Sequence, residues 1–204
     1  MTLARRFAEQ LARPTGRSGR LLGLAMDLAN RKPTRIAIDR LRPVPGESIL
    51  DAGCGTGAAM RALLRLRPGA LTGIDPSATM IAAARRRLGD SATLHVSTLE
   101  ALPLPDACFD AALALNMLYF CDRESGMIRA FHRLLKPGGR LVAYVTHRRS
   151  MEDWAFARQG IHRLFDADEL ADAIAEGGFA RDHIHVEEIS LTASIRGLVA
   201  HAER

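Results

Sequence analysis

The stretch Ile49-Leu50-Asp51-Ala52-Gly53-Cys54-Gly55-Thr56-Gly57 decides the fold class. A short apolar segment, residues 48–51, runs directly into three alternating glycines, and a helical pattern follows over residues 58–66. Glycine tolerates positive φ and lets a ligand approach the backbone closely, and a helix N-terminus presents unpaired N–H groups. The stretch therefore predicts a strand, a loop and a helix, with a ligand site in the loop.

Outward from this loop, strand and helix patterns alternate. Strands are expected at residues 48–51, 71–74, 92–96, 110–115 and 140–146, and helices at 58–66, 77–88, 123–135 and 166–176. The alternation predicts an α/β fold with a parallel sheet covered on both faces. The last two strand candidates, 183–189 and 194–201, have no helical pattern between them and are expected to pair as an antiparallel edge.

The spacing of the glycines separates two classes of ligand. A dinucleotide site has G-x-G-x-x-G, with the pyrophosphate at the helix N-terminus. Here the spacing is G-x-G-x-G, and Asp51 stands two positions before the first glycine. An aspartate repels a pyrophosphate and attracts the ammonium group of a methionine moiety. The absence of a Gly-Lys-Ser/Thr sequence after the loop excludes a Walker loop.

Asp75 ends the second expected strand, in Gly73-Ile74-Asp75. A carboxylate at that point can accept hydrogen bonds from both hydroxyls of a ribose. The alternative is a structural role, as the N-cap of a helix that begins at Pro76. Other nucleotide-binding folds share this feature, so by itself it also allows a nicotinamide-dependent oxidoreductase.

Four stretches in order resemble the motifs of class I S-adenosylmethionine-dependent methyltransferases. They are the glycine loop, Gly73-Ile74-Asp75-Pro76-Ser77, residues 102–110 (LPLPDACFD) and Leu135-Lys136-Pro137-Gly138-Gly139. The resemblance covers about residues 45–204 and is closest to the branch that modifies quinones and other small molecules (methyltransferase type 11-like). It implies a three-layer, Rossmann-like sandwich with a seven-stranded, mostly parallel sheet whose last strand is antiparallel, plus an N-terminal helical lid.

The resemblance also implies S-adenosylmethionine as the cofactor, with S-adenosylhomocysteine as its product. Asp51 and Gly53 would face the methionine portion and Asp75 the ribose, while Thr98 stands where the family often has an aspartate near the adenine. That departure leaves the adenine contact without a charge. The full set of expected cofactor-binding residues is Asp51, Gly53, Cys54, Gly55, Gly57, Asp75, Pro76, Thr98, Leu99 and Asn116.

A sulfonium is already an activated methyl donor, so the chain mainly has to align the acceptor and exclude water. Whether a base is needed depends on the acceptor. His147, after the fifth strand, and Tyr119, after the fourth, are the candidate catalytic residues; for each, packing or a surface position is the alternative. Further candidates are Trp154, Phe156 and His162, in the connection to the late helix, with the same alternative.

No metal site is predicted, since His183 and His185 lack further ligands nearby. The three cysteines, with no C-x-x-C spacing, fit a reducing cytoplasm. No apolar run reaches the roughly 20 residues that span a bilayer, and no signal-peptide pattern opens the chain.

The net charge of +5 is concentrated at the N-terminus, where residues 1–47 hold ten Lys or Arg against four Asp or Glu. Residues 1–42 are interpreted as a helical substrate-covering segment, with helical stripes at 3–13 and 21–28 interrupted by Pro14, Gly16 and Ser18-Gly19. Residues 43–204 form the cofactor-binding domain. Residues 1–40 could also contact a membrane surface. Nucleic acid is disfavoured because Phe7 is the one aromatic residue of this segment.

The predicted function is methylation of a small-molecule acceptor, apolar or lipid-like, by direct in-line transfer. Two alternatives stay open. A non-catalytic binding or regulatory module fits Thr98 and the lack of an obvious base. An RNA methyltransferase would use the basic N-terminal segment.

Overall fold

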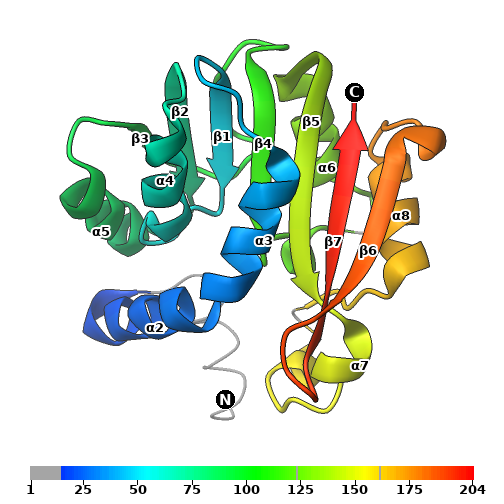
Figure 1. Cartoon of the computed structure of the whole chain (residues 1–204). Coiled ribbons are helices and arrows are strands. Elements are labelled where there is room, and N and C mark those ends of the chain that lie inside the picture. Colours follow the sequence, from blue (N-terminus) through cyan, green and yellow to red (C-terminus); the bar gives the residue numbers. More distant parts are fainter. Residues whose placement is uncertain (1–14, 123, 161) are drawn as a thin grey trace.

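A seven-stranded sheet runs through the centre of the computed structural model (Figure 1), which describes residues 15–122, 124–160 and 162–204. The strands lie in the order β3-β2-β1-β4-β5-β7-β6. Their bounds are β1 Ser48–Ala52, β2 Ala70–Asp75, β3 Thr93–Val96, β4 Phe109–Leu115, β5 Leu135–Thr146, β6 Ile184–Ser190 and β7 Arg196–Glu203.

Strands β1 to β5 are parallel, and β7 runs antiparallel to both of its neighbours, β5 and β6. The predicted parallel sheet and its antiparallel last strand are therefore confirmed. The last strand lies inside the sheet, however, and β6 takes the edge. Burial explains the order, because residues 197–200 of β7 are all buried while β6 alternates between half-buried and exposed positions.

Helices cover both faces of the sheet (Figure 1). On one face lie α3 (Arg31–Leu41), α4 (Ala58–Leu63) and α5 (Ala78–Leu88), and on the other α6 (Gly126–Leu134) and α8 (Ala167–Glu176). Strand β1 shows why two layers form, since Ile49 packs with the first group and Leu50 with the second. Short helical turns complete the chain: η1 (Leu64–Leu66), η2 (Leu118–Phe120), α7 (Arg148–Met151), η3 (Ala157–Gln159) and η4 (Arg181–His183).

Helix α3 belongs to the core, which corrects the assignment of all of residues 1–42 to a substrate-covering segment. Its buried residues, Pro33, Ala37, Ile38 and Leu41, lie on one face at helical spacing, and the last three join the core cluster beneath the sheet. Arg140 of β5 then fixes the end of the helix by donating to the carbonyl of Leu41 (2.6 Å). The apolar stripe of α3 is thus a core stripe.

Helix α2 (Gly16–Ala29) lies across the carboxyl ends of β1 and β2 (Figure 1). The interruption expected at Gly16 and Ser18-Gly19 is wrong, because the helix runs through both. Gly23 permits close packing against the glycine loop: a Cβ there would lie 3.0 Å from Thr56 Cγ2. The stripe expected at residues 3–13 lies outside the described residues. None of the helices in the described ranges has the length and hydrophobicity needed to cross a bilayer.

The fourth expected helix and the strand after it begin at residues other than those expected from the sequence. Helix α6 begins at Gly126 instead of residue 123, because Ser125 has a left-handed backbone and Asp122 Oδ1 accepts the Gly126 N–H (3.0 Å). Strand β5 begins at Leu135 instead of residue 140, and Lys136 Nζ donates to Asp110 Oδ1 (2.7 Å). A hydrogen bond therefore joins the motif at residues 135–139 to the motif at residues 102–110. Asp166 and Glu169 form a capping box at the start of α8.

Candidate functional site

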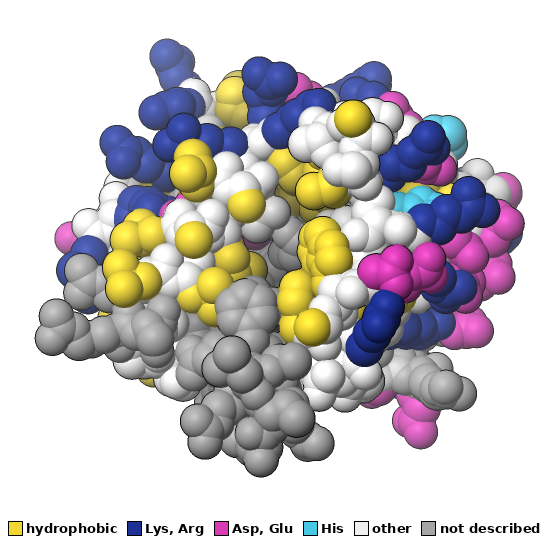
Figure 2. All heavy atoms as spheres, turned by 90° about the horizontal axis from the view of Figure 1, so that it is seen from below, with side chains coloured by type: hydrophobic (Ala, Val, Ile, Leu, Met, Phe, Trp, Pro, Cys, Tyr) yellow, Lys and Arg dark blue, Asp and Glu magenta, His cyan; other side chains and the backbone are white. Residues whose placement is uncertain are grey.

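A cavity of about 330 Å³ opens at the carboxyl ends of β1, β2 and β4, beneath α2. Its volume falls in the range of about 300–1,000 Å³ typical of small-molecule sites. Figure 2 looks onto this end of the molecule and shows hydrophobic side chains gathered around the hollow, with acidic side chains concentrated at one side. The position matches the general rule that open parallel sheets bind ligands at this edge.

The glycine loop forms one wall of the cavity. Gly53 and Gly55 have φ angles of +69° and +53°, a region that side chains with a Cβ rarely adopt. Both line the cavity, and a Cβ on Gly55 would meet nothing within 4 Å. The N–H of Cys54 donates to the carbonyl of Ile74 (2.9 Å), which fixes the loop against β2. The loop thus presents bare backbone to the cavity.

Gly57 has a structural role in the loop. It is absent from the described lining of the cavity, and its φ of +79° makes it the N-cap of α4. A Cβ there would lie 3.0 Å from Leu88 Cδ1 and 3.2 Å from Ala84 Cβ, both on α5. This glycine lets α4 and α5 pack closely, and its assignment to cofactor binding stays a prediction.

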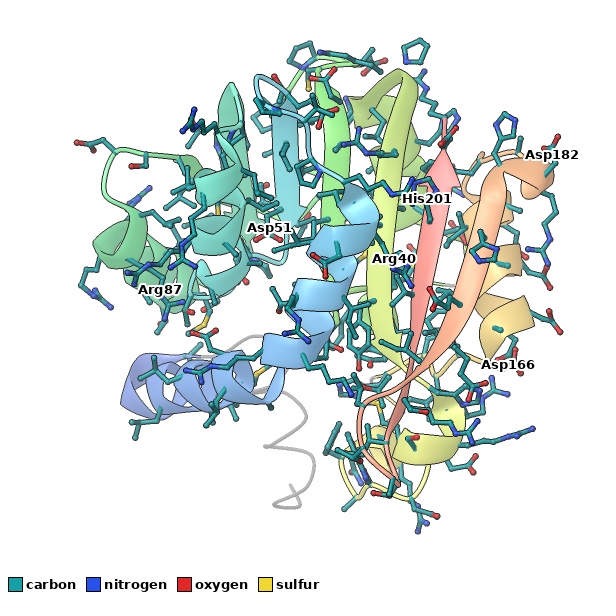
Figure 3. All side chains as sticks on the ribbon, in the orientation of Figure 1. Arg40, Asp51, Arg87, Asp166, Asp182 and His201 are labelled. Carbon is teal, nitrogen blue, oxygen red and sulfur yellow. The ribbon has the colours of Figure 1, made fainter. Side chains whose placement is uncertain are left out.

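Asp51 carries the strongest electrostatic signal of the site. It lies at the end of β1 (Figure 3), is 1% exposed and lines the cavity. Its Oδ2 has no hydrogen-bond partner, a state that within the described chain only His162 Nδ1 shares among buried side-chain nitrogens and oxygens. Burial, with a smaller contribution from the charge of Asp75, raises the pKa of Asp51 to about 8. A cation in the cavity would restore the ionised form.

Asp75 joins the loop to the second helix of the site. Its Oδ2 accepts the N–H of Gly55 (3.0 Å) and its Oδ1 the N–H of Ser77 (2.8 Å). Ser77 is the residue that caps α5, accepting the N–H of Met80 (3.3 Å). The N-cap alternative for Asp75 is therefore wrong, and its carboxylate lies in the cavity wall as the cofactor interpretation requires.

Asn116 follows β4 with a φ of +55°, a conformation that asparagine tolerates better than most residues. Its Nδ2 donates to Asn30 Oδ1 (3.0 Å), and its Oδ1 accepts from the Tyr119 hydroxyl (3.2 Å). Both asparagines line the cavity. The turn after β4 is thus tied directly to the junction of α2 and α3.

The remaining expected cofactor residues also lie in this cavity. Cys54, Pro76, Thr98 and Leu99 are all part of its lining. Thr98 is exposed and carries no charge, as its sequence indicates, but Glu100 lines the cavity two positions later. A carboxylate is therefore present at this wall after all.

The N-terminal helices contribute residues that sequence reasoning missed. Asp27 Oδ2 accepts from the Thr56 hydroxyl (2.6 Å) and from Arg87 (2.8 Å), and Arg87 also donates to Thr56 (2.5 Å). Figure 3 shows Arg87 on α5, beside α2. The signal in the sequence is a pair of polar residues, Asp27 and Asn30, at the end of the apolar stretch 21–28. The missed lining residues of these helices are Gly23, Met26, Asp27, Asn30 and Thr34.

The two candidate catalytic residues lie outside the described lining of this cavity. The Tyr119 hydroxyl accepts the N–H of Thr146 and donates to Asn116, and burial raises its pKa. His147 is buried, and its Nδ1 accepts the N–H of Arg149 (3.0 Å) as the N-cap of α7. These contacts support the packing alternative for both residues and disfavour either as a base.

Within the described ranges, no three His, Cys, Asp or Glu side chains gather closely enough to hold a metal ion. The expectation that the chain binds no metal stays a prediction.

Comparison with known proteins agrees with this geometry. Residues 50–143 match the family model described as "Methyltransferase domain". The ubiquinone biosynthesis O-methyltransferase of Methylocella silvestris is 41% identical over 123 residues, which are 58% of this chain and 47% of that protein. The demethylmenaquinone methyltransferase of Tropheryma whipplei is 37% identical over 144 residues, 68% of this chain and 56% of that protein.

Among solved structures, an S-adenosylmethionine-dependent methyltransferase from Mesorhizobium loti superposes with a TM-score of 0.71. It is 24% identical, and the match covers 86% of this chain and 98% of that one, which supports the fold. The chain spans about half the length of the two curated relatives. Fold, site and matched domain agree: residues 50–143 are similar to the methyltransferase domain family, and the two curated relatives are methyltransferases.

Proposed function

We propose that the chain binds S-adenosylmethionine in the cavity beneath α2 and transfers its methyl group to a small, apolar or lipid-like acceptor. The observation that carries the proposal is the buried Asp51, whose Oδ2 is unpartnered in a cavity lined by bare glycine backbone. Burying a carboxylate without a partner is costly unless a cationic ligand completes the site. The ammonium of a methionine moiety is such a ligand.

The lining residues fit the parts of this cofactor. Asp51 would hold the ammonium group, and Gly53 and Gly55 leave room for the methionine chain. Asp75 would accept from the ribose hydroxyls, and Leu99 and Glu100 would border the adenine. When bound, the sulfonium supplies an electrophilic methyl group. The chain's own task is then to orient the acceptor and keep water out.

The acceptor side of the cavity is apolar. Met26, Met117, Phe120 and Met127 line it together with the two hydrogen-bonded asparagines. Methionine side chains adapt to irregular apolar ligands, which supports a small apolar acceptor. The two curated relatives, a ubiquinone biosynthesis O-methyltransferase and a demethylmenaquinone methyltransferase, support the same class of substrate.

A non-catalytic binding module is the second candidate, favoured by the engaged hydrogen bonds of Tyr119 and His147. The two functions differ in one measurement. Incubation of the chain with methyl-labelled cofactor and fractionated metabolite extracts should yield a labelled small molecule. Cofactor binding with no labelled product from any fraction would favour the non-catalytic module. Product formation that is lost on ribonuclease treatment would favour RNA.

Calorimetric titration with S-adenosylhomocysteine tests the cofactor site directly. We expect a dissociation constant well below about 1 mM for the native chain. Asp51→Asn keeps the size of the side chain but removes the charge, and it should weaken binding at least tenfold. Asp39→Asn, on the exposed side of α3, is the matched control and should leave the affinity unchanged. Equal affinities for all three proteins would overturn the proposed site.

We also infer a cytoplasmic location for this activity. Cys54, Cys108 and Cys121 are all free thiols, and free thiols persist in a reducing compartment.

A further inference from the structure

Asn30 and Asn116 form a hydrogen-bonded pair of amides in the wall of the cofactor cavity. Nδ2 of Asn116 donates to Oδ1 of Asn30 (3.0 Å), and Oδ1 of Asn116 accepts from the hydroxyl of Tyr119 (3.2 Å). The Tyr119 oxygen in turn accepts the backbone N–H of Thr146. Three side chains and one backbone amide thus form a continuous chain of hydrogen bonds that ends in the cavity wall.

The direction of this chain of hydrogen bonds is fixed at its buried end. A backbone N–H can only donate, so the Tyr119 oxygen uses a lone pair on Thr146 and its own proton has to go elsewhere. Tyr119 is 5% exposed, and burial raises its pKa, so the proton stays on the phenol and needs an acceptor. That acceptor is Oδ1 of Asn116, which orients the amide and leaves its Nδ2 facing Asn30.

The same reasoning orients the amide of Asn30. Because its Oδ1 accepts from Asn116, its Nδ2 points away from that residue and carries two N–H groups. Within the described ranges, no group accepts from this Nδ2, and it is not among the sealed, unpartnered atoms of the interior. An asparagine at the N-cap of a helix usually accepts a backbone N–H, but Asn30, the N-cap of α3, makes no such bond. Its amide therefore offers hydrogen-bond donors to the cavity.

The charges around the cavity favour a neutral oxygen as the partner of this amide. The described lining holds no lysine, arginine or histidine, and it includes the carboxyl groups of Asp27, Asp51, Asp75 and Glu100. Asp27 is paired with Arg87, which lies outside the described lining. An anionic acceptor brought to this wall would be repelled by the carboxylates, whereas a carbonyl oxygen accepts hydrogen bonds without carrying a charge.

We propose that the amide of Asn30 donates to a carbonyl oxygen of the methyl acceptor and so selects neutral molecules that carry this group. The assignment rests on the proposed methyl transfer and adds the polar group that the acceptor must present. Met26 and Phe120, which line the same cavity, are suited to contact its apolar body. Tyr119 is a positioning residue in this scheme, because it acts on the ligand only through Asn116.

The test is a binding experiment on the full chain saturated with S-adenosylhomocysteine. The probes are 2-acetylnaphthalene, which has a carbonyl oxygen, and 2-isopropenylnaphthalene, in which a methylene group replaces that oxygen at nearly the same shape. We expect the native chain to bind the ketone about fivefold more tightly than the alkene, the net effect of one hydrogen bond. Equal binding of the two probes, or no binding of the ketone, would overturn the proposal.

Asn30→Asp reverses the polarity of the subsite while keeping its partner. One carboxylate oxygen can still accept from Asn116, and the other presents lone pairs where the native chain has N–H groups. The variant should bind the ketone no more tightly than the alkene. Gln159→Glu makes the same amide-to-carboxylate change outside the described lining and should keep the native preference. A native preference in Asn30→Asp would show that another group binds the carbonyl.

Tyr119→Phe tests the fixed direction of the hydrogen bonds. The variant keeps the ring and removes the proton that orients Asn116, so both amides become free to turn over. The preference for the ketone should fall, while affinity for S-adenosylhomocysteine should not. The infrared carbonyl band of bound, carbon-13-labelled ketone should lie at lower wavenumber in the native chain than in Tyr119→Phe or Asn30→Asp. An identical band in all three proteins would contradict the assignment.

Asn30→Ala separates the acceptor from the cofactor as the source of the oxygen. The methionine portion of the cofactor also carries a carboxylate, and an amide that served it would be missed in the variant. We expect Asn30→Ala to lose the preference for the ketone and to keep its affinity for S-adenosylhomocysteine. A loss of that affinity by about tenfold would overturn the assignment to the acceptor. Failure of S-adenosylhomocysteine to bind the native chain would instead overturn the proposed function itself.

Discussion

Asp27 of α2 and Arg87 of α5 form an ion pair of 2.8 Å at the rim of the cofactor cavity. The hydroxyl of Thr56, in the glycine loop, lies between them and bonds to both. A helix near the N-terminus is thereby attached to the loop that carries the cofactor site. Because the two charged side chains are only about one-quarter exposed, the pair is less screened than an ordinary surface ion pair.

Replacing Asp27 by asparagine should loosen α2 without unfolding the domain. The loss of the ion pair should cost about 1 kcal/mol, equivalent to about fivefold faster hydrogen exchange of the α2 amides. Exchange measured by mass spectrometry checks the prediction, with Asp39→Asn on α3 as the matched control. Unchanged protection of α2 in Asp27→Asn would contradict a fastening role for this pair.

Affinity for S-adenosylhomocysteine should depend on pH through Asp51. The pKa of this carboxyl is about 8 in the empty site, so near neutral pH the folded chain holds a proton that a bound ammonium would displace. Affinity should therefore rise from about pH 6 and level off above about pH 8. Calorimetry in buffers with different ionisation enthalpies measures the released proton, and Asp51→Asn should release none from this site.

The raised pKa of Asp51 also predicts how stability depends on pH. Affinity should rise with pH, whereas the free energy of unfolding of the ligand-free chain should fall. Between the unfolded value of 3.8 and about 8, the folded chain holds this proton and the unfolded chain does not. The contribution of Asp51 to the free energy of unfolding therefore falls as the pH rises through that window. Asp51→Asn should melt several degrees higher than the native chain at about pH 8. A lower melting temperature would show that the carboxylate is already satisfied.

Gly57→Ala should destabilise the fold while leaving cofactor contacts intact. The left-handed backbone costs about 1–2 kcal/mol for a residue with a Cβ, and the new methyl group would press on Leu88 at 3.0 Å. Gly160→Ala is the matched control, because its φ of +73° is similar and nothing lies within 4 Å of its Cβ. Thermal unfolding should show the larger loss for Gly57→Ala. Weaker cofactor binding at full stability would instead support the predicted cofactor contact of this glycine.

The planar guanidinium of Arg140 donates to both carboxylate oxygens of Glu47 and to the carbonyls of Leu41 and Arg42. A lysine cannot reproduce this arrangement. Arg140→Lys should therefore lower the free energy of unfolding by about 2 kcal/mol at neutral pH. The hydrogen bond from Arg140 lowers the pKa of Glu47. The stabilisation from that carboxylate is therefore present above about pH 4.5 and is lost as the pH falls through the lowered value. Urea unfolding at several pH values measures it.

The control for this pair is Arg40→Lys on α3. The ion pair of Arg40 with Glu187 is far more exposed to solvent. The change should therefore lower the free energy of unfolding by about 0.5 kcal/mol or less. Equal losses for the two arginines would contradict the importance of burial at Arg140.

Membrane contact through residues 1–40 stays a prediction, and α2 now offers a test of it. Leu21, Leu24 and Leu28 are 70%, 51% and 61% exposed on this helix. Their spacing puts them on one face, as in helices that lie at a membrane surface. Leu21→Ser with Leu28→Ser should lower sedimentation with phosphatidylglycerol vesicles about tenfold or more. Leu66→Ser, an exposed leucine of η1, should have no effect, and native protein that does not bind vesicles would end the idea.

The sequence best predicted those residues of the candidate site that lie at the end of a strand. Asp51 and Asp75 lie at the carboxyl ends of β1 and β2, and Asn116 directly follows β4, so their meeting at one edge follows from parallel topology. Asp27 could not be placed, because its partners lie 29 and 60 residues away and depend on where α2 packs. The packing role of Gly57 could not be predicted, because the neighbours that require a glycine, Ala84 and Leu88, lie on another helix. His162 could be named from the sequence only by its place in the connection before α8, since an unpartnered nitrogen is visible only in three dimensions.

The position of β7 between β5 and β6 also sets an order of assembly. During synthesis, β1 to β5 and their helices can form while residues 196–203 are still to be made, so the half with the glycine loop is able to mature early. Strand β6 has no direct partner in β5 and must wait for β7. Until then the hydrogen-bonding edge of β5 is bare, and a bare edge invites pairing with other chains. The nascent protein is thus most prone to aggregation just before its last strand is inserted.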